Sequence, residues 1–395
     1  MTGSPRLGYC TNIHPGESLA EVIAAIDGPV ARVANKLGGR VDLGLRLGGA
    51  AARELRDADA RARLREALAR ASARVFTLNG FPYGRFHGTV VKEAVYRPDW
   101  SEPARVEYTR DLTDVLVAIA DREVARPSIS TVPGAFAARA RTEGATSAIA
   151  TNLAEVAADL WRRCEAGGRE VVLALEPEPC CMLETIEETV AFFAAHVFAG
   201  TGLATFMQRT GTSAAQAEAA LRTHVGVCLD ACHAAVEFED PRSCVDTLVA
   251  AGIAIAKVQV SAGLELVPTS ESLTRVRAFA DPVYLHQVVA ETPDGLERYL
   301  DLADALERAR EARRWRVHFH VPVFAAEFRR PGCPGVLAST QPFLIALLQH
   351  VRRTNASAQF EVETYTWDVL PAEHRALPLE DAIVRELTWT AAQLR

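Results

Sequence analysis

Residues 171–179 read VVLALEPEP, a short apolar run that ends in two glutamates, each followed by proline. A continuous apolar run of this length is typical of a parallel strand that is buried on both faces. Because side chains two residues apart share one face of a strand, Glu176 and Glu178 are expected to point the same way. The stretch predicts a buried parallel strand that delivers both carboxylates to one edge of a sheet.

The same pattern, an apolar run followed by a longer amphipathic segment, repeats along the chain on both sides of this stretch. Helix starts are marked by capping boxes at Ser18 and Thr185 and by Asp240 before proline, and apolar spacing predicts helices around 296–303 and 383–391. Strands that alternate with helices imply parallel βαβ units, and this many units favour a closed (β/α)8 TIM barrel of the α/β class over an open sheet. The strand candidates are 7–13, 41–47, 74–81, 128–132, 171–178, 225–230, 255–261, 316–321 and 360–366.

Nine strand candidates are one more than such a barrel holds. We therefore expect an insertion over residues 262–315, before the last strands, within a single barrel domain that spans residues 1–395. No internal repeat, low-complexity tract or linker divides the sequence.

Composition excludes several classes of protein. The 395 residues have 49% hydrophobic and 24% charged side chains, which is ordinary for a globular protein. A net charge of -7 argues against nucleic-acid binding, which usually needs a basic face. The first residues, MTGSPRLGYC, lack the apolar region of a signal peptide, and no apolar run approaches the ~20 residues of a membrane span. We expect a cytoplasmic protein whose eight cysteines are reduced, without the paired CxxC knuckles of a structural zinc site.

Polar and charged side chains stand late in the strand candidates or directly after them. The C-terminal strand ends of a TIM barrel form its active site, so these side chains are expected to converge. Because several ionisable groups late in buried strands are hard to explain as separate core features, the whole set favours a functional site. Its members are Asn12, His14, Arg46, Asn79, His87, Glu176, Glu178, Asp230, His233, Lys257, Gln259, His318, His320, Glu361 and Glu363.

Each motif taken singly keeps a structural alternative. The spacing Asp230-x-x-His233 also fits a helix cap and a surface histidine, the EPEP sequence also fits a rigid turn, and Arg46 also fits a structural ion pair. Lys257 is one of three lysines in the chain and lies in the middle of a strand candidate. We expect it to pair with a barrel carboxylate, and a Schiff-base nucleophile is the alternative.

These residues resemble the xylose-isomerase-like family of sugar isomerases and epimerases. That family places Glu, Asp, His and Glu on successive late strands as ligands to a divalent cation. The resemblance implies a metal site of Glu176, Asp230, His320 and Glu363, with His233 as a substrate-binding residue. The chain departs from the family pattern in KVQVS, where the spacing from Asp230 calls for the histidine ligand and Gln259 stands instead. Either His320 or Gln259 is then the third ligand.

A closer resemblance is to the EboE family of metabolite traffic proteins, which belongs to bacterial gene clusters of secondary metabolism. It implies a role in making or moving a secondary-metabolite precursor, without a defined reaction. The resemblance rests on YCTNIHPGE, FTLNGFPYG, FHG, VKEAVYRPDW, ALEPEP, CLDACHAAVEFEDP, DPVYLHQVV, VHFHVP and EVETYTWDVLP.

The function expected from these features is metal-assisted isomerisation or epimerisation of a sugar or cyclitol. Glu176 and Glu363 would take and return a proton next to a carbonyl. The metal is expected to be Mn²⁺ or Mg²⁺, with Zn²⁺ as the alternative, because the ligand set contains no sulfur. A loop at 81–88, FPYGRFHG, is expected to close over the site. Substrate-binding roles are predicted for His14, Arg46, Asn79, His87, Glu178, His233, Gln259 and His318.

Three other functions stay open. Endonuclease IV shares the barrel and the D-x-x-H motif, but it needs a basic face for DNA. A Schiff-base lyase would use Lys257 without a metal. A non-catalytic carrier would bind a metabolite and hand it on. The expected partner is a small polyhydroxylated substrate, and we expect neither nucleic-acid binding nor membrane insertion. The sequence leaves open whether the chain also forms a homo-oligomer.

Overall fold

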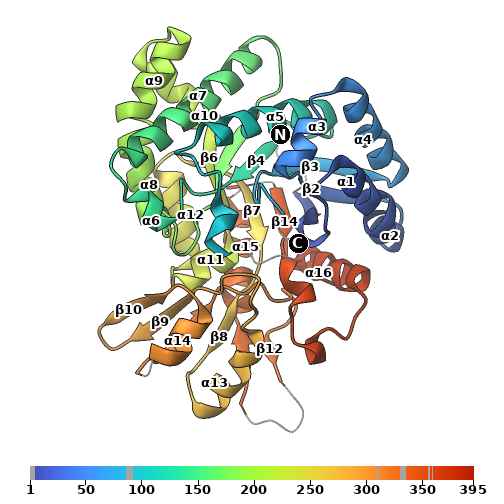
Figure 1. Ribbon diagram of the computed structural model, residues 1–395, viewed down its shortest axis with the longest axis vertical. Coiled ribbons are helices and arrows are strands. Elements are labelled where there is room, and N and C mark those ends of the chain that lie inside the picture. Colours follow the sequence, from blue (N-terminus) through green and yellow to red (C-terminus); the bar gives the residue numbers. More distant parts are fainter. Residues whose placement is uncertain (1–4, 86–91, 309–310, 330–334, 355, 358) are drawn as a thin grey trace.

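The computed structural model describes residues 5–85, 92–308, 311–329, 335–354, 356–357 and 359–395, and its centre is a closed barrel of eight parallel strands (Figure 1). The order around the barrel is β1-β14-β7-β6-β5-β4-β3-β2. The strands are β1 (Arg6–Cys10), β2 (Val41–Arg46), β3 (Ala73–Asn79), β4 (Ser128–Thr131), β5 (Val172–Leu175), β6 (Val225–Asp230), β7 (Ala254–Val260) and β14 (Gln359–Val362). The predicted (β/α)8 fold is confirmed.

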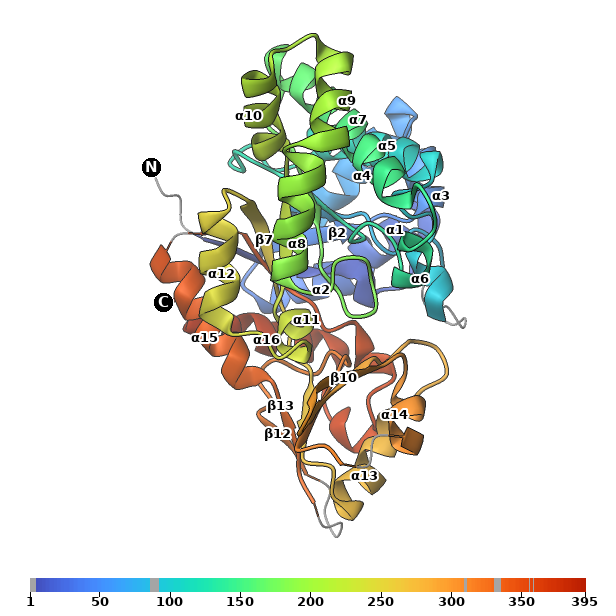
Figure 2. The ribbon, with the colours of Figure 1, turned by 90° about the vertical axis from the view of Figure 1, so that its left-hand side faces the viewer.

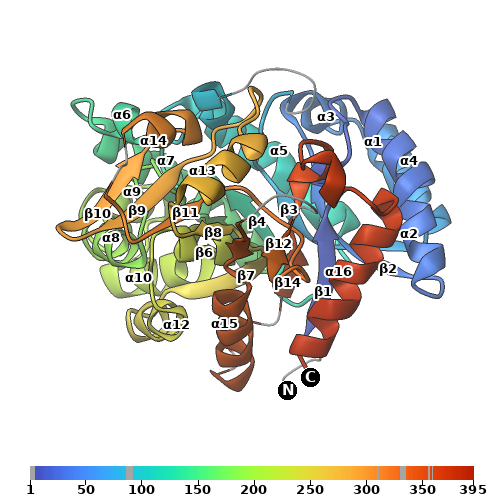
Figure 3. The same cartoon turned by 90° about the horizontal axis from the view of Figure 1, so that it is seen from below.

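The barrel closes where its first and last strands meet. Residues 6–9 of β1 pair with residues 359–362 of β14, and these two strands lie side by side in Figure 3. Closure leaves no unpaired strand edge in the barrel. The helices outside the barrel and the side chains inside it cover the two faces of the strands, and all four residues of β5 are buried.

Helices connect successive strands on the outside of the barrel. The capping boxes predicted at Ser18 and Thr185 are formed, and Asp240 caps the helix that begins at Pro241. The main helices are α1 (Leu19–Ala25), α2 (Ala31–Lys36), α3 (Gly49–Glu54), α4 (Ala58–Arg70), α5 (Pro103–Ile119), α6 (Ala137–Ala140), α7 (Ala145–Glu165), α8 (Ile186–Phe192), α9 (Gly200–Thr210), α10 (Ala214–His224), α11 (Ala231–Val236), α12 (Pro241–Ala250), α15 (Gln341–Thr354) and α16 (Leu379–Gln393).

A second sheet lies between β7 and β14 in the sequence and projects from one end of the barrel (Figure 2). Its order is β10-β9-β11-β8-β13-β12, and each neighbouring pair is antiparallel. The strands are β8 (Leu264–Leu266), β9 (Val288–Thr292), β10 (Gly295–Tyr299), β11 (Arg314–Val317), β12 (Glu327–Phe328) and β13 (Leu337–Ser339), with helices α13 (Ser270–Val276) and α14 (Leu302–Arg308). The segment outside the barrel thus continues past Trp315 to Ser339.

The strand predicted at 316–321 is not a barrel strand. Residues 314–317 form β11, which pairs with β8 and β9 of the second sheet, and residues 318–322 continue as an irregular segment. Trp315 and Val317 are buried, whereas Arg314 and Arg316 are partly exposed. This alternation is typical of an antiparallel strand with one solvated face and distinguishes β11 from the barrel strands.

The helix predicted around 296–303 is also wrong in its first half. Residues 295–299 form β10, the second strand of a hairpin with β9, and α14 starts only at Leu302. The turn ends at Gly295, whose φ of 131° is a conformation that glycine adopts readily. The chain reverses there, and β10 pairs with β9 along its whole length.

Among the described residues, no single helix combines the length and apolarity of a membrane span. One bent pair, Ile186–Val197 with Gly200–Thr210, passes on length and composition alone.

Candidate active site

The barrel interior contains a buried ion pair between Lys257 of β7 and Glu361 of β14. The ammonium group donates to Glu361 Oε2 and to Asn79 Oδ1, the latter over 2.7 Å, and Asn79 Nδ2 donates to Glu361 Oε1 over 2.7 Å. Lys257 and Glu361 are both 0% exposed. The predicted pairing of Lys257 with a barrel carboxylate is confirmed.

This pairing argues against the Schiff-base reading of Lys257. Burial lowers the pKa of the amine, but the Glu361 carboxylate more than offsets it and raises the pKa above its usual range. The amine is therefore protonated, and its hydrogens are directed at Glu361 and Asn79 instead of at the cavity. A protonated, enclosed amine is a poor nucleophile.

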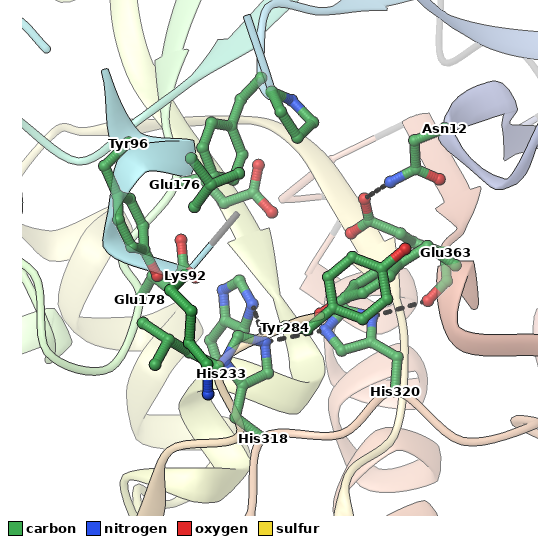
Figure 4. Close-up of a pocket in the computed structure, with 15 residues that line it drawn as sticks. Asn12, Lys92, Tyr96, Glu176, Glu178, His233, Tyr284, His318, His320 and Glu363 are labelled. Atoms are coloured by element: carbon green, nitrogen blue, oxygen red, sulfur yellow. Dashed lines mark hydrogen bonds between the residues drawn. The ribbon is translucent and has the colours of Figure 1, made fainter. Parts of the chain in front are cut away.

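Above this ion pair, at the C-terminal ends of the strands, lies a cavity. The volume within which the centre of a water molecule can move is about 60 Å³. A single water needs roughly 10–15 Å³ by this measure, so the cavity holds several waters or a small molecule. Its polar lining comes from barrel strand ends and from the second sheet's connections (Figure 4). The lining residues are Asn12, Phe81, Pro82, Lys92, Val95, Tyr96, Glu176, Glu178, His233, Tyr284, Leu285, His318, His320, Glu363 and Tyr365.

Three carboxylates gather at this cavity, one each from Glu176, Asp230 and Glu363. One oxygen from each lies within 4.8 Å of the others, and all three residues are buried. Burial raises the pKa of Glu176 and of Glu363, and the negative charge of the neighbouring carboxylates raises it further. Such crowding of acidic groups is unfavourable for the ionised forms unless a cation lies among them.

Hydrogen bonds fix the orientation of the Asp230 carboxylate. The residue ends β6 and caps α11: Oδ1 accepts from the His233 amide over 2.9 Å and from Ser261 Oγ over 2.7 Å. Oδ2 is buried without a hydrogen-bond partner among the described residues. A buried carboxylate oxygen without a donor, beside two further carboxylates, suits a hard divalent cation, so the residues present fit a metal.

Three histidines form the opposite part of the lining. His233 belongs to α11, whereas His318 and His320 follow β11 in the irregular segment, and both line the cavity. Burial lowers the pKa of all three imidazoles, and the neighbouring histidines lower that of His233 and His318 further. The imidazoles are therefore neutral near pH 7 and able to bind a cation through nitrogen.

Glu178 faces the same cavity from the turn after β5. Tyr96 OH donates to Glu178 Oε1 over 2.6 Å, and Gln287 Nε2 donates to the Tyr96 oxygen over 3.2 Å. Burial raises the pKa of Glu178 to about 8, although the Tyr96 hydroxyl lowers it. This chain of hydrogen bonds fixes a third glutamate beside the cavity.

The structure brings some of the predicted site residues to the cavity and not others. Glu176, Glu178, His233, His318, His320 and Glu363 line it, and an Asp230 oxygen lies within 4.8 Å of the carboxylate oxygens of Glu176 and Glu363. His14 is close to Tyr9 OH, at 3.1 Å, and lines a separate hollow with Arg46. Asn79 and Gln259 are enclosed in the barrel interior beside Lys257. His87 lies outside the described residues.

The two open readings of Arg46 are resolved in favour of an ion pair. Its guanidinium donates to Glu17 over 2.8 Å and to the main-chain oxygens of Gly16, Pro82 and Gly84. Arg46 therefore ties the end of β2 to the loops after β1 and β3.

Tyrosines from three segments were missed by the sequence analysis as cavity residues. Tyr96 reaches in from the connection after β3, Tyr284 from the second sheet's connections, and Tyr365 from the turn after β14. Only Tyr365 carried a usable signal, since it stands two residues after Glu363. Asn12 donates to Glu363 Oε1 over 2.6 Å and thereby orients that carboxylate.

Comparison of folds finds solved TIM barrels that share the architecture of this chain, some of them described as xylose isomerase-like. A xylose isomerase-like TIM-barrel protein from Mycobacterium smegmatis in complex with magnesium is 9% identical at a TM-score of 0.50, over 99% of this chain and 96% of that one. An IolI protein with a bound zinc atom has 12% identity and a TM-score of 0.47, with 98% and 97% covered. The 3-keto-D-glucoside 4-epimerase YcjR from E. coli has 12% identity and a TM-score of 0.45, with 98% and 100% covered.

At these identities the likeness is one of fold alone. The sequence matches no family model, and none of the curated proteins matches it.

Proposed function

We propose that this protein is a metal-dependent isomerase or epimerase of a small polyhydroxylated ketone, such as a sugar or a cyclitol ketone. The observation that carries the proposal is the gathering of the Glu176, Asp230 and Glu363 carboxylates at the floor of a small cavity at the C-terminal strand ends. Active sites of TIM barrels lie at this end. The crystal structure with magnesium of the M. smegmatis protein supports a cation in a fold of this kind.

The metal would be held by Glu176, Asp230 and Glu363, whose oxygen donors favour Mg²⁺ or Mn²⁺. When bound, the metal polarises a substrate carbonyl and acidifies the neighbouring C–H. His320, expected as the remaining ligand, lies within 4.8 Å of Asp230 and His233 by their ligand atoms. Gln259 is enclosed at the ion pair of Lys257, which favours His320 over Gln259 in that role.

The chain's own residues would hold the substrate and move its proton. Glu176 and Glu363 come from β5 and β14, two strands that are separated by β6 and β7, so they approach the cavity from different sides. One takes the proton from the carbon next to the carbonyl, and the other returns it. Asn12 fixes the Glu363 carboxylate, and Tyr96 fixes Glu178 toward substrate hydroxyls.

The resemblance to the EboE family suggests that the substrate is an intermediate of bacterial secondary metabolism. That part of the proposal rests on the sequence motifs alone. A carrier that only binds such a molecule is the competing function, and the proton transfer separates the two.

The experiment is solvent exchange in D₂O. The protein, loaded with Mg²⁺ or Mn²⁺, is incubated with a panel of ketoses, their phosphates and cyclitol ketones, and deuterium at the carbon next to the carbonyl is followed by NMR. We expect exchange with at least one compound and a loss of about 10²–10⁴-fold in Glu363→Gln. Metal occupancy is measured on the same samples, because Glu363 is both ligand and base.

Glu291→Gln is the matched control, since Glu291 lies in β9 of the second sheet and pairs with Arg314. It should exchange at the wild-type rate. Binding of a panel compound by the metal-loaded protein without any exchange would instead identify a carrier.

A further inference from the structure

Among the described residues that line the cavity, Lys92 alone carries a permanent positive charge. It begins the short helical turn Lys92–Tyr96 in the connection after β3, and Tyr96 of the same turn also lines the cavity. In Figure 4, Lys92 lies on the side of Tyr96, across the cavity from Glu363. A positive charge is thus placed on the opposite side of the cavity from one of the two proposed proton-transfer groups.

The two other cations near the strand ends that the sequence brought forward are committed elsewhere. Lys257 is enclosed in the barrel interior, where it pairs with Glu361. The Arg46 guanidinium pairs with Glu17 and lines a separate hollow. Neither side chain is available to a molecule in the cavity, which leaves Lys92.

The Lys92 ammonium group has unused donors. It carries three N–H groups, and it donates to Asp301, which lies between β10 and α14. In the part of the chain that the structure describes, no second acceptor lies within hydrogen-bond distance of the ammonium nitrogen. Two N–H groups are therefore left for water or for a molecule in the cavity.

The ion pair between Lys92 and Asp301 is one that a ligand can join or replace. The Lys92 side chain is 38% exposed and the Asp301 side chain is 16% exposed. Pairs that water reaches contribute little to stability, because water screens the two charges and both side chains lose freedom on pairing. A carboxylate or phosphate oxygen of a ligand can therefore take the place of Asp301 without a large loss.

The negative charges of the cavity make Lys92 decisive for such a ligand. Glu176, Glu178 and Glu363 line the same cavity, so an anionic group without a positive partner would be repelled. We infer that the cavity takes a polyhydroxylated compound that carries a carboxylate or phosphate group, and that Lys92 binds this group.

This inference specifies the substrate class of the proposed function, and it rests on that function because it takes the cavity as the substrate site. The reacting carbonyl would lie between Glu176 and Glu363, with the anionic group on the side of Lys92. Sugars and cyclitols that lack a negative charge would then be poor ligands.

The chain has three lysines, so NMR of selectively ¹³C-labelled lysine gives one set of side-chain signals for each of them. The full chain, loaded with Mg²⁺, is titrated with gluconate and fructose 6-phosphate and with their uncharged counterparts glucitol and fructose. Calorimetry on the same samples gives the dissociation constants.

The variants are Lys92→Met, Asp301→Asn and the matched control Lys36→Met. Lys36 belongs to α2 and pairs with Asp381 on the outside of the barrel. The signal of Lys257, in the barrel interior, reports in each spectrum that the variant is folded.

We expect at least one of the two anions to shift the Lys92 signal in a saturable way, to leave the Lys36 signal in place, and to bind about tenfold more tightly than its uncharged counterpart. The anion that binds identifies the group as a carboxylate or a phosphate. Lys92→Met should abolish or reverse the preference for the anion, because the cavity carboxylates remain. Lys36→Met should keep it, and Asp301→Asn should strengthen it, since a competing carboxylate is removed.

Equal binding of the charged and uncharged compounds would overturn the role of Lys92. The same holds for a preference that survives Lys92→Met, and for a Lys92 signal that neither anion shifts. Anion binding at Lys92 without any exchange in D₂O would reject the isomerase and leave the role of Lys92 standing. Exchange of an uncharged ketone as fast as that of its phosphate would support the isomerase and overturn the role of Lys92.

Discussion

His320 Nδ1 lies 2.8 Å from the main-chain oxygen of Glu363, so the last barrel strand orients an imidazole that arrives from the second sheet. The Thr366 hydroxyl donates to the His320 oxygen and closes the same contact from the other side. The antiparallel sheet is therefore joined to the barrel at the site itself. Displacing either segment would move both a carboxylate and a histidine.

Glu386 of α16 links the two segments of this junction through hydrogen bonds. Its Oε1 accepts from Thr364 Oγ1 over 2.6 Å and from the Val323 amide over 3.2 Å, one residue after Glu363 and three after His320. Burial raises its pKa from the ordinary 4.5 to about 7, although its donors lower it.

A carboxyl whose pKa is raised on folding stabilises the protein while it is protonated in both states, and this stability is lost as the pH rises through the folded pKa. The free energy of unfolding should therefore fall between pH 4.5 and 7 by up to about 3 kcal/mol on account of Glu386. Urea unfolding at a series of pH values measures this. Glu386→Gln should reduce the fall over that window by this amount, whereas the part due to other buried carboxyls such as Glu178 should persist. An unchanged profile would contradict the prediction.

Removing only one member of the ion pair between Lys257 and Glu361 should destabilise the protein far more than replacing both. Lys257→Met leaves Glu361 buried without its cation, which costs about 3–5 kcal/mol. Adding Glu361→Gln should restore most of that loss, because the amide oxygen still accepts from Asn79. Urea unfolding of the single and double variants gives the coupling energy. A loss below about 1 kcal/mol in Lys257→Met would show that the pair is unimportant for folding.

Gly44 of β2 makes room for the Glu361 carboxylate. A Cβ at this position would lie 1.3 Å from Glu361 Oε1, so Gly44→Ala must displace the carboxylate from Lys257. We expect a loss of about 3 kcal/mol or more, from overpacking together with the broken pair. Gly28→Ala is the control, since its Cβ would meet nothing nearer than an Arg32 nitrogen at 3.7 Å. Thermal denaturation should show Gly44→Ala unfolding far below the wild type, with Gly28→Ala close to it.

Binding of metal should stabilise the fold through Asp230. At a concentration 100 times its dissociation constant, Mn²⁺ should raise the free energy of unfolding by about 2.7 kcal/mol. Asp230→Asn should abolish most of this increase. Its remaining oxygen can still cap α11, because Oδ1 alone accepts from the His233 amide. Asp246→Asn, at a surface residue paired with His350, serves as the control. An equal metal-induced shift in Asp230→Asn would place the ion elsewhere.

The sequence by itself determined the elements of the barrel and the chemistry available to them. Apolar runs and helix caps fixed eight strands and most helices, because burial on both faces and local capping depend on neighbouring residues alone. The carboxylates of Glu176 and Glu363 were assigned to the cavity end because each stands at the end of its predicted strand, and each directly follows β5 or β14 in the structure. The pairing of Lys257 followed from the cost of a charge inside a barrel.

Only the tertiary structure decided which side chains meet. His318 and His320 reach the cavity from an antiparallel sheet, although HFHVP was predicted to be a barrel strand. Asn79 and Arg46 stand at strand ends like the cavity residues, yet their hydrogen bonds go to Glu361 and Glu17. These outcomes depend on strand register and on contacts between residues far apart in the chain. No local pattern records which distant group will lie within 3 Å.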